Sequence, residues 1–350
     1  MLVKAANRPI DLPADMAPLL TVIIDTEEEF DWDQPFSRDN VAVESIATQL
    51  AAQEIFARYG IVPTYVIDYP VAATESAVSC LKPLMEAGAC EIGAHLHPWV
   101  SPPYEEEVCA LNSYPGNLAA ELERSKLVQL TDTIERNFGR RPTVYKAGRY
   151  GVGPNTASIL AELGYEVDVS VVPYTAFTND GGPDFRDFAF QPYWFGDDDA
   201  RLLELPLSCG FYGALSSLGQ QLFPLVSGPL GLSVRLPGIL SRSHMLERIR
   251  LSPEGANHAE HRRLTKSLMK QGCRMFSFTY HSPSLAVGHT PYVRSEAELR
   301  GFLDSLDRYF DFFMNELGGK PTTPASFRAQ LNESAPAATP SQAAAVAAGA

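Results

Sequence analysis

The segment Thr21-Val-Ile-Ile-Asp-Thr-Glu-Glu-Glu-Phe-Asp-Trp32 passes from a purely apolar run directly into carboxylates. Side chains alternate between the two faces of a strand, so Asp25 and Glu27 point to the same face. A run of charged residues is usually a solvated surface. Here no turn signal separates the run from the strand, and Phe30 and Trp32 interrupt it. The segment therefore predicts a buried strand whose end lines a pocket.

A pair of histidines ends a second apolar run, Cys90-Glu-Ile-Gly-Ala-His-Leu-His-Pro-Trp99. His95 and His97 share one face in extended backbone, which is a useful spacing for one metal ion. A structural pair capped by backbone carbonyls is the alternative interpretation. Two imidazoles at a strand end favour the metal, because two imidazoles, one carboxylate and open positions for water form a catalytic zinc-type set. The remaining carboxylate, from Asp25 or Glu27, is then free to act as a base.

Two further strands also end in polar residues. In Thr143-Val-Tyr-Lys-Ala-Gly-Arg-Tyr-Gly151, Arg149 follows a strand, and its permanent charge can orient a carboxylate base. In Ser277-Phe-Thr-Tyr-His-Ser-Pro283, His281 ends the last strand, where an imidazole can protonate a leaving amine or alkoxide. A surface arginine and a hydrogen-bonded core histidine are the alternative interpretations.

Short strand-like runs alternate with longer helix-like segments along the chain. This alternation predicts an α/β fold with a parallel sheet, and seven strands suggest a barrel-like closure with active residues at the strand ends. The predicted strands are residues 19–25, 62–68, 90–95, 143–147, 166–172, 202–207 and 274–280. The predicted helices are residues 43–59, 75–87, 118–138, 156–163 and 295–317.

Three regions depart from this alternation. We expect an N-terminal extension (1–18) before the barrel (19–320) and a low-complexity tail (321–350) after it, with 333–350 disordered. A long insertion, residues 209–272, interrupts the barrel before its last strand. Its apolar part is either a lid over the barrel mouth or the self-association surface of a homo-oligomer.

Composition narrows the choice of partners and compartment. The net charge of −14 argues against nucleic acid and against an anionic membrane surface. Five cysteines without a CxxC pair indicate free thiols rather than a disulfide framework. The first residues lack the apolar core of a signal peptide, and the most apolar later stretch is interrupted by proline and arginine. These features favour a cytoplasmic protein without a membrane partner.

Four motifs, IIDTEEEFDW, EIGAHLHPW, YKAGRYG and TYHSPSL, follow one another along residues 19–320. In this order they resemble the polysaccharide deacetylases, the NodB-homology or carbohydrate esterase family 4 enzymes, in a divergent bacterial branch. The resemblance implies a distorted seven-stranded (β/α) barrel with an insertion before its last strand. It also implies a hydrolase acting on carbon–nitrogen bonds other than peptide bonds. Such an enzyme uses a divalent metal, zinc first with cobalt or nickel as alternatives, to remove an N- or O-acetyl group from a saccharide.

The resemblance also implies roles for six residues. They are Asp25 as base, Arg149 as the residue that orients it, His281 as catalytic acid, and Glu27, His95 and His97 as metal ligands. The second histidine of the family normally lies four residues after the first, where this chain has Trp99, so His97 takes its place. The leucine expected two residues before the acid is Thr279, and Asp168 falls where the family places an acid near that histidine.

Two alternative functions fit the same residues. A metal-free glycosidase would use two of the clustered carboxylates. A deacetylase-like scaffold without turnover would bind carbohydrate, and the irregular second and last motifs motivate that interpretation. The carboxylates considered for the glycosidase are Asp25, Glu27, Glu28 and Glu204. The aromatic residues expected to stack on sugar rings are Trp32, Trp99, Tyr104, Tyr150 and Trp194.

Overall fold

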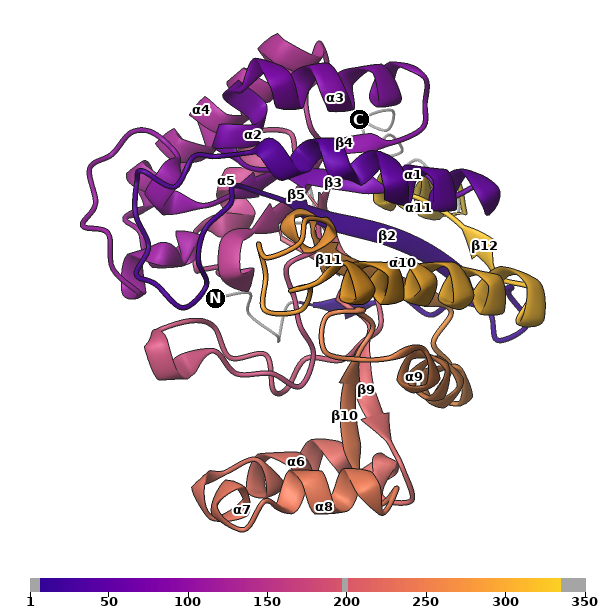
Figure 1. The fold of residues 1–350 in the computed structure, drawn as a ribbon. Coiled ribbons are helices and arrows are strands. Elements are labelled where there is room, and N and C mark those ends of the chain that lie inside the picture. The colour runs from indigo at the N-terminus through magenta and orange to yellow at the C-terminus, as the bar shows by residue number, and fades with distance from the viewer. Residues whose placement is uncertain (1–6, 197–200, 335–350) are drawn as a thin grey trace, which may run out of the picture.

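Seven parallel strands form the centre of the computed structural model, which describes residues 7–196 and 201–334 (Figure 1). Their order in the sheet is β8-β6-β5-β4-β3-β2-β11. Each coincides with a predicted strand, although β6 and β8 are shorter than predicted. The strands are β2 (Leu19–Thr26), β3 (Thr64–Ile67), β4 (Glu91–Leu96), β5 (Val144–Ala147), β6 (Val167–Asp168), β8 (Leu202–Glu204) and β11 (Met275–His281).

The register between neighbouring strands brings the polar strand ends together. His281 at the end of β11 pairs with Asp25 of β2, and His95 of β4 pairs with Lys146 of β5. All eight residues of β2 are buried, because helices pack on one face of the sheet and side chains of the other strands fill the barrel on its other face. Since parallel strands end at one edge, the side chains that follow them meet there.

The sheet curls into a partly closed barrel rather than a complete one. Within the described chain no strand ladder joins β8 to β11, and single hydrogen bonds bridge the gap. The Ser208 hydroxyl accepts from the Ser277 N–H at 2.9 Å, the Leu251 N–H donates to the Ser208 carbonyl at 2.8 Å, and the Thr279 N–H donates to the Leu251 carbonyl at 3.2 Å. The predicted closure is therefore made by residues next to β8 and β10.

Short strands extend the sheet at places where no strand was predicted. β1 (Arg8–Pro9) pairs with β7 (Tyr193–Phe195), which runs antiparallel to β8. β12 (Lys320–Pro321) pairs with β2. The expected N-terminal extension thus contributes one edge strand.

Helices cover the sheet and bury its aromatic face. Phe278 of β11 stacks on Tyr309 with ring centroids 5.1 Å apart, and both are buried with Phe310. The five predicted helices are present as α1 (Gln49–Arg58), α3 (Glu75–Glu86), α4 (Ala120–Phe138), α5 (Thr156–Glu162) and α10 (Glu296–Asp311), with the short α2 (Tyr69–Ala73) added. A 3-10 turn, Glu44–Thr48, precedes α1, and a π-helical turn, Phe312–Glu316, follows α10. No described helix is both long enough and apolar enough to cross a bilayer.

The insertion forms an arm that projects from the barrel in Figure 1. We define the arm as residues 209–250, from the first residue of β9 (Cys209–Tyr212) to the last of β10 (Glu247–Arg250), which pair antiparallel. Its tip, residues 213–246, contains α6 (Gly219–Val226), α7 (Pro229–Ser233) and α8 (Leu236–Arg242). α9 (His258–Lys270) then leads back to β11.

The chain after the barrel begins with a helix. α11 (Pro324–Ser334) packs Phe327 against apolar side chains of the sheet. The remainder of the predicted low-complexity tail, residues 335–350, lies outside the described residues. The five cysteines carry free thiols, and Cys90, Cys209 and Cys273 are buried.

Replacing the bridging hydroxyl tests how the barrel closes. Ser208→Ala leaves the buried Ser277 N–H without its acceptor, so we expect a loss of about 1–3 kcal/mol in the free energy of unfolding. Urea unfolding followed by circular dichroism measures this loss. Ser79→Ala, at an exposed position of α3, is the control and should change stability by less than about 0.5 kcal/mol. Equal stability of the two variants would contradict a structural role for the bridge.

Candidate active site

A cavity of about 310 Å³ lies at the carboxyl ends of the strands. All six residues expected to form the site line it: Asp25, Glu27, His95, His97, Arg149 and His281. They come from β2, β4, β11 and the turns that follow the strands. Five of the six face one another across a small volume, whereas Arg149 is directed elsewhere.

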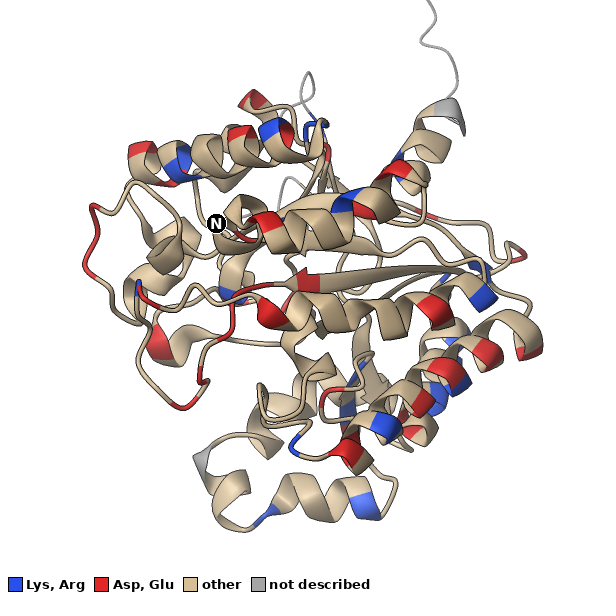
Figure 2. Ribbon diagram, turned by 45° about the horizontal axis from the view of Figure 1, so that its top comes forward, with Lys and Arg blue, Asp and Glu red and all other residues tan. Residues whose placement is uncertain are grey.

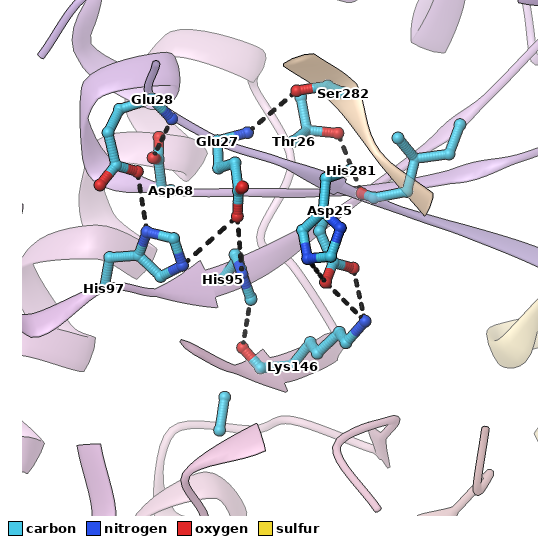
Figure 3. A network of polar contacts seen from close by, with 12 residues as sticks. Asp25, Thr26, Glu27, Glu28, Asp68, His95, His97, Lys146, His281 and Ser282 are labelled. Atoms are coloured by element: carbon cyan, nitrogen blue, oxygen red, sulfur yellow. Dashed lines mark hydrogen bonds and ion pairs between the residues drawn. The ribbon is translucent and has the colours of Figure 1, made fainter. Parts of the chain in front are cut away.

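One carboxylate and two imidazoles converge at the edge of β2 and β4 (Figure 3). The Oε2 atom of Glu27 lies 3.6 Å from Nε2 of His95 and 3.5 Å from Nε2 of His97. Candidate ligand atoms of the three residues all lie within 4.8 Å of one another. The Oε1 atom of Glu27 is buried and has no hydrogen-bond partner among the described residues. A buried oxygen in that condition calls for a cation or a donor.

Hydrogen bonds on the far side of each ring fix the tautomers. Nδ1 of His95 donates to the Lys146 carbonyl at 2.9 Å, and Nδ1 of His97 donates to Glu28 at 2.7 Å. Both Nε2 lone pairs are therefore left facing Glu27. Burial lowers the pKa of His95 and lowers that of His97 to about 4, so both rings are neutral. Neutral imidazoles oriented by a second hydrogen bond are what a divalent ion requires, and the residues fit zinc.

A second layer of carboxylates supports His97. Glu28 accepts from His97 and, at 2.7 Å, from the indole N–H of Trp99. Its own N–H donates to Asp68 at 2.7 Å. Burial raises the pKa of Asp68 well above its ordinary value, and the neighbouring Glu28 raises it further, so Asp68 is the neutral member of this pair of carboxyls. Trp99, at the position where the resemblance leads one to expect a histidine, stacks on the ring of His97 with centroids 4.3 Å apart.

A glycine allows the next strand to approach these rings. A Cβ added to Gly148 would lie 2.4 Å from the Leu96 carbonyl oxygen and 2.6 Å from Cδ2 of His97. Any side chain at this position would therefore displace the imidazole.

Asp25 forms a buried ion pair with Lys146, a residue for which the sequence predicts no role. Nζ of Lys146 lies 2.5 and 2.7 Å from the two carboxylate oxygens and donates to the Thr279 hydroxyl at 3.4 Å. Burial raises the pKa of Asp25, but the charges of Lys146 and His281 outweigh burial and lower it. Asp25 is therefore ionised, although almost no solvent reaches it.

Arg149 does not orient Asp25, contrary to the prediction. It pairs with Asp180, donates to the Ser113 hydroxyl at 2.6 Å and covers the ring of Tyr114. The backbone explains the difference, because Arg149 and Tyr150 have φ of 53° and 62° and turn the chain away from the end of β5. Lys146, three residues earlier and still within β5, makes the contact expected of Arg149.

His281 is held by a carboxylate of the insertion. Its Nδ1 donates to Glu254 at 2.7 Å, and its Nε2 lies 3.5 Å from Asp25. Burial would lower the pKa of His281, but the charges of Glu254, Glu27 and Asp25 raise it well above its ordinary value. The backbone N–H of His281 and the hydroxyl of Ser284 also donate to Glu254. The ring is thus protonated, and its Nε2–H points into the cavity.

The acid expected beside His281 lies elsewhere. Asp168 accepts from Ser170 and shares a hydrogen bond with Glu204, and neither carboxylate lines the cavity. Nothing in the sequence identified Glu254, which lies 27 positions before His281 in a turn between β10 and α9. For Lys146 a signal existed, because a lysine inside an otherwise buried strand requires a partner.

Aromatic rings form the remaining wall of the cavity. Of the five residues proposed to stack on sugars, Trp32, Trp99 and Tyr150 line it. Tyr104 instead packs beside Arg38 and Lys126, and Trp194 lies in β7. The lining also includes Phe30, Phe36, Tyr114, Phe177 and Tyr292.

Comparison with solved structures identifies the fold. The chain resembles a putative polysaccharide deacetylase from Mycobacterium smegmatis with a TM-score of 0.56 and 15% identity, covering 93% of this chain and 94% of that one. A probable polysaccharide deacetylase from Pseudomonas aeruginosa PAO1 gives a TM-score of 0.51 and 16% identity, covering 96% and 98%. The chain has the polysaccharide deacetylase fold.

The structure also resembles that of a protein that is not named a deacetylase. The PuuE allantoinase matches with a TM-score of 0.51 and 15% identity, covering 91% of each chain. The sequence matches no protein-family model and none of the curated proteins. The predicted NodB-type barrel is therefore confirmed as a deacetylase fold by its structural neighbours.

Removing one partner of the buried ion pair tests its contribution to stability. Lys146→Met leaves Asp25 buried without its cation, so we expect a loss of about 3–5 kcal/mol in the free energy of unfolding. The double variant Asp25→Leu/Lys146→Met removes both charges and should lose much less. Urea unfolding measures the free energy of unfolding of wild type, the single variant and the double variant. Lys270→Met, at an exposed position of α9, is the control, and equal losses in the single and double variants would refute the ion-pair argument.

The link between His281 and Glu254 gives a pH-dependent prediction. Folding raises the pKa of His281, so the pair stabilises fully below about pH 6.5 and the contribution is lost as pH rises through the raised value. In Glu254→Gln the titration midpoint of this imidazole should fall by about one pH unit or more. Proton–nitrogen NMR of the metal-free protein measures the midpoint. An unchanged midpoint would show that Glu254 does not hold the proton on the ring.

Proposed function

We propose that this protein is a metal-dependent hydrolase that removes an acetyl group from an N- or O-acetylated saccharide. One observation carries the proposal: a ligand set of Glu27, His95 and His97 shares a cavity with an ionised carboxylate and a protonated imidazole. This combination supplies a cation site, a base and an acid within one small volume. Zinc is the metal that the donor atoms favour.

When bound, a divalent ion would polarise the acetyl carbonyl and make water more acidic. Asp25 is the residue that accepts a proton from the attacking water. Lys146 keeps Asp25 ionised and fixes both of its oxygens. Because Asp25 is buried, its carboxylate does not have to shed a full solvent shell before it acts.

His281 supplies the proton that the leaving group requires. The oxygen of water adds to the acyl carbon, the bond from carbon to the sugar nitrogen or oxygen breaks, and Nε2–H of His281 protonates the departing atom. The products are acetate and the free amine or alcohol. Glu254 fixes the ring orientation and retains the second ring proton on Nδ1.

The aromatic wall supports a saccharide as substrate. Trp32 stands edge-on to His281, with ring centroids 4.9 Å apart, and Tyr292 stands edge-on to Trp32. Flat apolar rings beside a polar centre suit the apolar face of a sugar ring. The cavity of about 310 Å³ is at the small end for ligand sites, which favours a single acetylated residue at the reacting position.

A carbohydrate-binding protein without turnover is the second candidate. The observation in its favour is the Lys146–Asp25 pair, because a carboxylate whose pKa is lowered is a weaker base. Saccharide binding without release of acetate, even with added zinc, would favour this function.

Metal content and acetate release test the proposal together. Wild-type protein should hold about one equivalent of metal by elemental analysis and release acetate from an N-acetylglucosamine oligomer. A chelator should abolish release, and zinc or cobalt should restore it. His97→Ala should lower the metal content and the rate at least tenfold, because it removes a ligand.

His258→Ala, on α9 and away from the cavity, is the matched control and should keep both metal and rate. Release of acetate that persists in the chelator, or full metal content in His97→Ala, would overturn the proposal.

A further inference from the structure

The tip of the arm is apolar on both its inner and its outer face. On the inner side Val226, Leu236 and Leu240 pack with Phe211 and Leu246 into a small core of their own. A helix in water normally turns a polar face outward once its inner face is packed.

The outer side of the tip does not follow this rule. Leu225, Leu230 and Ile239 are 74%, 85% and 55% exposed. In the described part of the chain, seven of the twelve exposed large apolar side chains lie between residues 218 and 245. A concentration of this kind marks a surface that is covered in use.

The charge of the tip is opposite to that of the whole chain. Residues 213–246 contain Arg235 and Arg242 and no aspartate or glutamate, whereas the chain carries −14 overall. In Figure 2 the helices of the tip, at the bottom of the view, carry blue segments and no red ones. The net charge that argued against an anionic membrane therefore does not describe this surface.

A basic groove of about 620 Å³ opens where the tip meets α9. Its charged lining is entirely basic in the described structure, with Arg262, Arg263, Lys266 and Lys270 from α9, and His244 of the tip also lines it. Arg262 and Arg263 pair with carboxylates outside the groove, Glu316 and Glu247. No ion pair of the described residues engages Lys266 or Lys270. The ammonium group of Lys266 lies over the ring of Phe312, 5.6 Å from its centroid, and since neither lysine is ion-paired, both can also meet an anion.

We propose that the tip of the arm docks on the surface of an anionic phospholipid bilayer. The outer leucines enter the interface between headgroups and acyl chains, and the basic groove takes up headgroup phosphates. None of the three tip helices is long enough to span, so the contact is with the surface. A second copy of the chain fits less well, because it would bring Arg235 and Arg242 of two tips together.

The arm also connects this surface to the cavity. β10 ends at Arg250, and Arg250, Ser252 and Glu254 all line the cavity wall. A bilayer under the tip would therefore lie at a fixed distance from the site. The docking proposal does not depend on the chemistry proposed for that site.

Vesicle sedimentation tests the proposal with the full-length protein. Phosphatidylcholine vesicles that contain phosphatidylglycerol should sediment the protein at low salt, and pure phosphatidylcholine vesicles should sediment at least tenfold less. Leu225→Ser/Leu230→Ser should bind the anionic vesicles at least tenfold less well, because burying one leucine is worth about that factor. Lys266→Ala/Lys270→Ala should weaken binding and reduce its dependence on salt.

Val41→Ser/Leu111→Ser replaces two apolar residues outside the arm that are 50% and 53% exposed and should bind like wild type. Thermal melting confirms that each variant is folded. Failure of wild type to sediment with anionic vesicles would overturn the proposal. A second result would also overturn it. If light scattering shows a dimer that Leu225→Ser/Leu230→Ser disrupts and the other variants do not, a second copy of the chain covers the tip.

Discussion

The buried pair between Lys146 and Asp25 is the interaction on which the rest of the site depends. Two charges removed from water are tolerated only when they meet with good geometry. The backbone register of the strands contributes to that geometry, because it aligns Asp25 of β2 with His281 of β11 and Lys146 of β5 with His95 of β4. An ionised carboxylate can therefore stand beside a cation site and a protonated histidine without unfolding the barrel.

Each polar group around this pair is oriented by a neighbour that can act in only one way, as a hydrogen-bond donor or as an acceptor. A carbonyl can only accept, so His95 must donate from Nδ1; Asp68 is neutral, so Glu28 is left to accept from His97 and Trp99. These outer contacts orient the inner atoms before any ligand arrives.

The sequence predicted the sheet well because its signals are local. Apolar runs followed by polar residues located all seven parallel strands and, of the six predicted site residues, the five that face one another across the cavity. Contacts between segments far apart in the sequence could not be predicted from these local signals. The choice of Lys146 over Arg149 depends on a left-handed turn at residues 149 and 150, and two positive φ values in non-glycine residues leave no sequence pattern. Glu254 was missed because its approach to His281 depends on how the whole insertion folds back.

Because Glu254 belongs to the insertion, the barrel and the insertion cannot be separated without changing the site. The strands provide the cation ligands and the base, yet the anchor of the acid arrives from the segment that looks like an accessory. A chimera that kept the barrel and exchanged residues 209–272 for a short loop would inherit an unsupported imidazole. The insertion is thus no interchangeable module, and the smallest transplantable unit of this architecture includes it.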